Sequence, residues 1–91
     1  MKDFNRKQTE NNDFEYDIKE RISTLNTSYG QTLELNLIQY GISKPKFDLR
    51  RWEGLKMCKG ITLNYYEVTK LRDVLNKYLS EKTESEIFSD L

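Results

Sequence analysis

The chain has 91 residues, of which 36% are hydrophobic and 33% charged, and its 15 basic and 15 acidic residues give a net charge of zero. This length accommodates one domain with a small core. Because a chain with so few hydrophobic residues buries little apolar surface alone, we expect it to gain stability by pairing with a second copy. One cysteine and no histidine argue against disulfides, most metal sites and nucleophile-base pairs, and they fit a reducing cytoplasm. No phosphate loop, cofactor motif or paired-carboxylate site is recognisable, so the sequence offers no argument for an enzyme.

The N-terminal residues 1–12 (MKDFNRKQTENN) are polar and contain no apolar run. We therefore expect a disordered arm without a secretory signal or membrane anchor. From Phe14 to Leu25 apolar and polar residues alternate loosely, which predicts a long first strand with one solvated face. Lys19 and Arg21 lie on that polar face, where they either extend a basic surface or simply contact solvent.

Turn-forming residues fill 26–31 (NTSYGQ). Tyr29 within this turn can stack on a base, although a loop tyrosine without such a role is the simpler interpretation. Residues 32–40 (TLELNLIQY) predict a second strand whose leucines face the core. Tyr40 shares a face with polar residues near the strand end, and it is a candidate either for stacking on a base or for packing on a neighbouring strand.

Residues 44–63 (KPKFDLRRWEGLKMCKGITL) predict a basic hairpin that turns at Glu53-Gly54. Alternation places the basic side chains and the single tryptophan, Trp52, on one face of its first strand, and only Arg51 breaks the pattern. Between positions 44 and 59, six basic residues stand against two acidic ones, a net charge of +4. The basic residues that we expect to bind a ligand are Lys44, Lys46, Arg50, Lys56 and Lys59.

A basic strand face with an aromatic ring at its end suits single-stranded nucleic acid, because phosphates attract cations and unstacked bases need a flat surface. A solvated hairpin with a half-buried Trp52 accounts for the same composition, and this alternative stays open. In the second strand of the hairpin, Gly60 indicates a bulge or a close approach of two backbones. A bulge there would let Lys56 and Lys59 serve one surface.

Asn64 and Glu67 predict the start of a helix that runs to about Leu79, with apolar residues at spacings of three and four. This stripe is wide for one small sheet, so we expect it to support a homodimer, with coverage of its own sheet as the alternative. The stripe residues that we assign to the dimer interface are Leu71, Leu75 and Tyr78.

Residues 81–91 form an acidic tail with a hydrophobic end. The tail resembles those of single-stranded-DNA-binding proteins, which recruit partner proteins and compete with DNA, and a frayed continuation of the helix is the alternative.

The run DLRRW, the turn, and KMCKGITL followed at once by a helix resemble the single-stranded-DNA-binding domain of the transcriptional coactivator positive cofactor four, and more closely its small bacterial YdbC-like relatives. The resemblance covers roughly residues 14–79. It implies an α+β fold: a four-stranded antiparallel curved sheet followed by one C-terminal helix (β-β-β-β-α), paired as a homodimeric saddle that holds single-stranded DNA. It also implies that Arg50 and Lys59 stand at basic contact positions and Trp52 at or next to an aromatic one, while the turn at Glu53-Gly54 is shorter than the coactivator's.

We therefore expect residues 13–80 to form a homodimeric, largely sequence-independent single-stranded-DNA-binding domain in the cytoplasm, flanked by the arm (1–12) and the acidic tail (81–91). No metal or cofactor is expected, and the tail is a candidate site for a protein partner. A transcription cofactor acting on melted promoter DNA or single-stranded RNA would use the same surface. A protein-interaction module without nucleic-acid binding is the alternative from another class, and the neutral net charge favours it.

Overall fold

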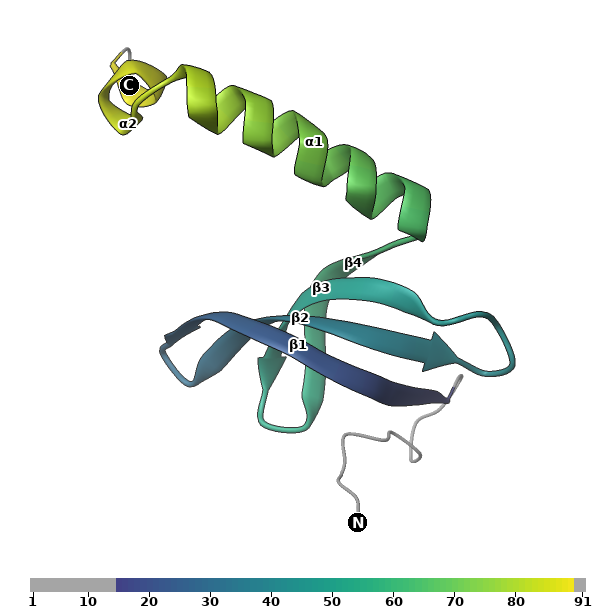
Figure 1. Ribbon diagram of the computed structural model, residues 1–91. Coiled ribbons are helices and arrows are strands. Elements are labelled where there is room, and N and C mark those ends of the chain that lie inside the picture. Colours follow the sequence, from purple (N-terminus) through teal and green to yellow (C-terminus); the bar gives the residue numbers. More distant parts are fainter. Residues whose placement is uncertain (1–14, 90–91) are drawn as a thin grey trace.

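The computed structural model describes residues 15–89, which form one four-stranded sheet and two helices (Figure 1). The elements are β1 (Tyr16–Ser28), β2 (Gln31–Tyr40), β3 (Lys46–Glu53), β4 (Lys56–Leu63), α1 (Tyr65–Glu81) and α2 (Glu84–Phe88). Each strand pairs antiparallel with its neighbour in the chain, in the order β1-β2-β3-β4. The predicted curved antiparallel sheet followed by a C-terminal helix is confirmed, and the predicted N-terminal arm lies outside the described residues.

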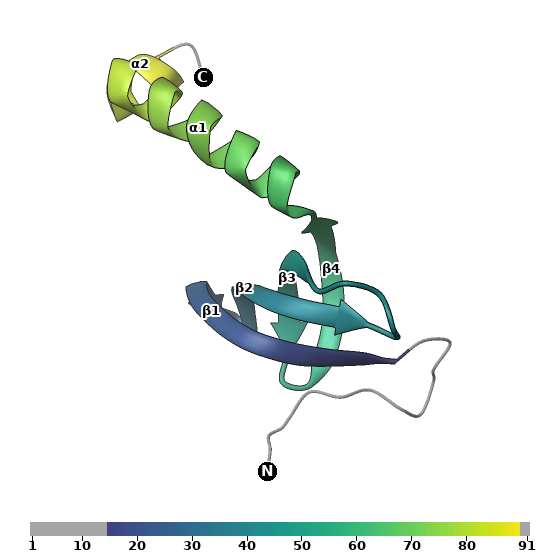
Figure 2. The same cartoon turned by 45° about the vertical axis from the view of Figure 1, so that its right-hand side comes forward.

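β1 ends at Ser28 and not at Leu25 as predicted, because the segment expected to be a turn narrows to Tyr29-Gly30. Both of these residues have positive φ angles, 51° and 77°, as a two-residue hairpin turn between twisted strands requires. The 13 residues of β1 pair with the 10 of β2 through three register shifts. Such bulges increase the local twist and bend the strand, so β1 curls along the edge of the sheet (Figure 2).

The sheet curves so strongly that side chains from its opposite ends meet. Tyr16 pairs with one end of β2, at Tyr40, and Trp52 pairs with the other end, at Thr32. In a flat sheet these ends would be about 27 Å apart, at about 3.4 Å per residue. The rings of Tyr16 and Trp52 nevertheless lie 6.1 Å apart, centroid to centroid. The face that carries both rings is therefore the inside of the curve.

The core lies on this inner face, whereas the sequence predicted it on the face of the leucines. The buried residues are Tyr16, Glu34, Asn36, Ile38, Asp48 and Trp52. The leucines of β2 are only half-buried, and on the same outer face they join further apolar residues of β3 and β4. We call this the leucine face: Leu33, Leu35, Leu37, Phe47, Leu49, Ile61 and Leu63. The prediction was wrong because alternation identifies two faces but not which one the sheet curls around.

A bulge in β4 next to Gly60 confirms the prediction for this strand. Arg50 pairs with Gly60 and Trp52 pairs with Met57, so one more residue lies on β4 than on β3 between these two pairs. At Gly60 an added Cβ would lie 1.9 Å from the Arg50 Cβ. Only glycine fits there, since the two strands approach too closely for any side chain.

α1 begins with the predicted capping box. The Asn64 side chain accepts a hydrogen bond from the Glu67 backbone N–H, and the Glu67 carboxylate accepts one from the Asn64 N–H, both at 2.8 Å. The helix leaves the sheet after β4 and rises away from it (Figures 1 and 2), and none of its residues is buried. Within residues 15–89 neither helix has the length and apolar character needed to span a membrane.

Candidate nucleic-acid interface

Arg50, predicted to contact phosphates, lies on the inner face, where a carboxylate holds it. Its Nε and Nη2 donate to the two oxygens of Asp48 at 2.7 and 2.8 Å, and its Nη1 donates to the Cys58 carbonyl at 3.0 Å. The Arg50 side chain is 15% exposed and that of Asp48 is fully buried. A guanidinium held in this bidentate pair is neutralised and fixed. In this conformation the Arg50 guanidinium satisfies the Asp48 charge, which leaves little of it available for the predicted phosphate contact.

Tyr40 completes the same network. Its hydroxyl donates to Asp48 at 2.9 Å, and its ring lies 6.2 Å from that of Tyr16. Burial, and then the hydrogen bond to Asp48, raise the pKa of the Tyr40 hydroxyl, while the hydrogen bond to Asp48 raises the pKa of Arg50. Of the two roles considered for Tyr40, the structure shows packing within the sheet.

Trp52 is fully buried, with a relative exposure of 0%, and it packs with Tyr16 and Ile38. In this conformation the ring has no exposed face for the predicted stacking on a base. The alternation that put Trp52 and Arg50 on one face was correct. That face is the concave interior of the sheet, so the same pattern buries both side chains.

The remaining basic residues of the hairpin are exposed and point to solvent. No carboxylate within residues 15–89 forms a salt bridge with Lys44, Lys46, Arg51 or Lys59. Lys56 has one exposed partner, Glu53, at 3.9 Å, and such a pair contributes little. The accessible cations fall at opposite ends of β3, with Lys44 and Lys46 at its start and the others near its end.

A groove of about 530 Å³ lies at that second end, on the leucine face. Leu33 and Leu49 supply apolar lining, and Arg51 and Lys59 bring positive charge to it. The bulge in β4 places Lys59 across from Arg51. Arg51, which broke the predicted alternation, therefore lines this groove. The break in the pattern was the only sequence signal for this position, and it did not identify the groove.

The same end of the sheet carries a fully exposed aromatic ring. Tyr29 occupies the β1–β2 turn with a relative exposure of 101%. Two residues later, Gln31 lines the groove and donates to Glu53 at 3.3 Å, which joins this turn to the β3–β4 turn. We name this end the tip surface: Tyr29, Gln31, Arg51, Lys56 and Lys59. It combines cations with a stackable ring, the features first expected of Arg50 and Trp52.

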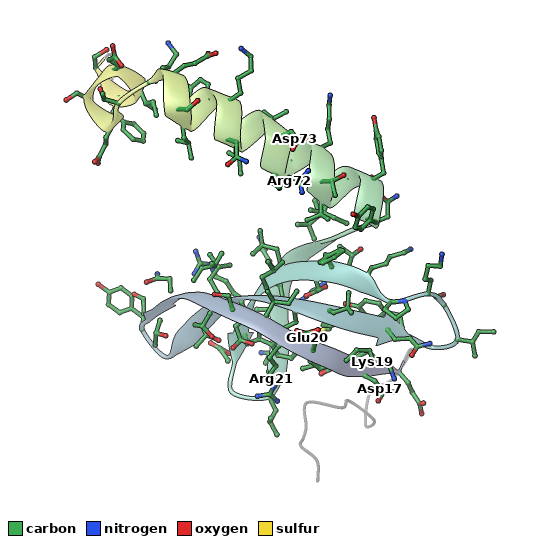
Figure 3. All side chains as sticks on the ribbon, in the orientation of Figure 1. Asp17, Lys19, Glu20, Arg21, Arg72 and Asp73 are labelled. Atoms are coloured by element: carbon green, nitrogen blue, oxygen red, sulfur yellow. The ribbon has the colours of Figure 1, made fainter. Side chains whose placement is uncertain are left out.

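On β1, carboxylates accompany Lys19 and Arg21, for which an extended basic surface and simple contact with solvent were the two alternatives. Figure 3 shows Lys19 and Arg21 on this strand beside Asp17 and Glu20. Two cations and two carboxylates leave this edge without net charge. Within residues 15–89, no three acidic or cysteine side chains are grouped so that they could hold a metal ion.

The residues assigned to a dimer interface are accessible. Leu71, Leu75 and Tyr78 are all more than 40% exposed along α1. Where α1 leaves the sheet, an apolar hollow of about 460 Å³ separates it from β3 and β4. Within residues 15–89 the apolar stripe of the helix is thus exposed, and most of the leucine face is only half-buried.

No family model matches the chain. A protein of Treponema pallidum (strain Nichols), named only as an uncharacterized protein, is 42% identical over 69 residues, which cover 72% of this chain and 81% of that protein.

Proposed function

We propose that this chain, which belongs to the same family as the Treponema pallidum protein, is a homodimer that binds single-stranded nucleic acid through the tip surface. The name of that relative states no activity, so the proposal rests on the residues of this chain. Binding depends little on base sequence, and we assign it no catalytic step. The free, half-buried Cys58 suits the reducing cytoplasm in which we place the protein.

The observation that carries this proposal is the unpaired charge at one end of the sheet. Arg51 and Lys59 have no carboxylate partner within the described residues, and Lys56 is held only weakly. Phosphates neutralise such cations and release counterions, which favours binding. Tyr29, in the turn at the same end of the sheet, supplies an exposed ring on which a base can stack. This contact is tolerant of sequence because every base has a flat face.

Homodimerisation is supported by the apolar surfaces that a single chain leaves open. The leucine face and the α1 stripe together exceed the scattered apolar residues of an ordinary surface. A second copy covers both at once, because a two-fold interface pairs identical patches. The dimer then carries two tip surfaces and can hold a longer strand than one subunit.

A titration of the full chain with labelled oligonucleotides tests the function. We expect single-stranded DNA to bind more tightly than duplex DNA, with a log-log salt slope of about −2 for the three cations of one tip at about 0.7 per phosphate. A parallel titration with single-stranded RNA separates a DNA binder from an RNA binder. Absence of binding to every oligonucleotide at low salt would contradict the proposal and favour a protein-interaction module.

A further inference from the structure

Within residues 15–89, the short helix α2 is not buried against the rest of the chain. It has five residues, and none of them is buried. A helix of this length is unstable alone in water, because a single turn does not repay the cost of nucleation. Its own N-terminus helps through a capping box between Thr83 and Glu86. The helix nevertheless presents Phe88, 53% exposed, for packing against another surface.

The chemistry of α2 complements the groove at the tip surface. Glu84 and Ser85 flank Phe88 along a shallow hollow of the α2 surface, and Glu86 adds a second carboxylate. The groove offers the opposite features, an apolar lining of Leu33 and Leu49 next to unpaired cations. Phe88 fits that lining, and the carboxylates of α2 fit the cations Arg51 and Lys59.

Within the described residues these two complementary surfaces do not meet in one chain. α1 has 17 residues and is therefore about 25 Å long. It holds α2 at its far end, away from the sheet (Figures 1 and 2). Two surfaces that fit each other but are held apart can meet between two copies, and in a closed two-fold pair the contact forms twice.

We infer that in the homodimer α2 of one subunit docks in the tip groove of the other, with Phe88 on Leu33 and Leu49 and the α2 carboxylates beside Arg51 and Lys59. This inference rests on the homodimer of the proposed function. The docked helix occupies two cations of the tip surface. Nucleic acid that uses the same cations must therefore displace α2, which makes the helix a built-in competitor of the ligand.

Disulfide trapping tests the contact, since Cys58 already lines the groove. Ser85→Cys places a second sulfur on the Phe88 side of α2. To restrict the bond to two different chains, Ser85→Cys is combined with Cys58→Ala and mixed with differently tagged wild-type chains. The matched control is Ser80→Cys in the same Cys58→Ala background, because Ser80 lies on the polar side of α1, opposite the apolar stripe.

Docking raises the effective concentration of the two sulfurs, so the Ser85→Cys mixture should form the mixed disulfide about tenfold faster than the Ser80→Cys mixture. Saturating oligonucleotide should slow this reaction. Equal rates in a chain that is dimeric by light scattering would overturn the inference and leave the homodimer intact. A rate that bound oligonucleotide does not change would overturn the competition. A monomeric wild type would instead refute the homodimer of the proposed function.

Discussion

The substitution Arg50→Ala tests whether Arg50 stabilises the fold, as its pair with Asp48 indicates, or contacts the ligand, as its position in the sequence suggests. The substitution leaves Asp48, fully buried, without the guanidinium that donates to both of its oxygens. Removing one partner of a buried pair costs about 3–5 kcal/mol. The matched control is Arg51→Ala, one residue along the same strand, where an exposed side chain without a salt bridge in the described residues should change stability by no more than about 0.5 kcal/mol.

Urea unfolding followed by the fluorescence of the buried Trp52 measures both variants. With a slope of about 1–3 kcal/mol per M, Arg50→Ala should lower the midpoint by about 1–5 M or leave the chain unfolded. If it does not fold, the double variant Asp48→Leu/Arg50→Met, which removes both charges, should recover most of the stability. Equal midpoints for Arg50→Ala and Arg51→Ala would refute the structural assignment of Arg50.

Trp52 emission should not change with saturating oligonucleotide, and Trp52→Ala should cost about 3–5 kcal/mol of stability; quenching by the ligand would place the ring at the bound bases instead. The raised pKa of Tyr40 favours the neutral hydroxyl in the folded state, so this contribution to stability is complete below pH of about 10 and is lost as the pH rises further. Tyr40→Phe should therefore flatten the alkaline fall in stability, and an unchanged profile would contradict that cause. Leu75→Glu should give a monomer or an unfolded chain, because it puts a charge in an apolar interface, while Ser80→Glu on the polar side of α1 should stay dimeric by light scattering; equal masses for two folded variants would argue against the interface.

Local patterns were sufficient to predict most of the fold. The capping box of Asn64 and Glu67 set the start of α1 because its hydrogen bonds join residues three apart. Gly60 marked the bulge and close approach in β4, since no other residue fits against the Arg50 Cβ. The end of β1 was predicted too early, at Leu25, because the three bulges of this strand disrupt the period of two on which a strand is recognised.

The binding site was harder to predict, because it depends on the direction of curvature. The alternation correctly grouped Arg50 with Trp52, but only the meeting of Trp52 with Tyr16 shows that this face is the inside. Tyr16 lies far from Trp52 in sequence, and no local pattern connects them. Arg51 was not predicted as a binding residue because it breaks the alternation. This same position on the other face of β3 places its charge at the groove.

The central claim, that single-stranded nucleic acid binds at the tip surface, is tested most directly by comparing the affinities of two double variants that lose the same charge. Arg51→Gln/Lys59→Gln removes two positive charges from the tip surface, and Lys44→Gln/Lys46→Gln removes two from the opposite end of β3. Titrated with a labelled single strand at several salt concentrations, the first variant should lose affinity and about 1.4 of the salt slope, at about 0.7 per phosphate, while the second stays close to wild type. Equal losses in both variants, or a loss confined to the second, would contradict binding at the tip surface.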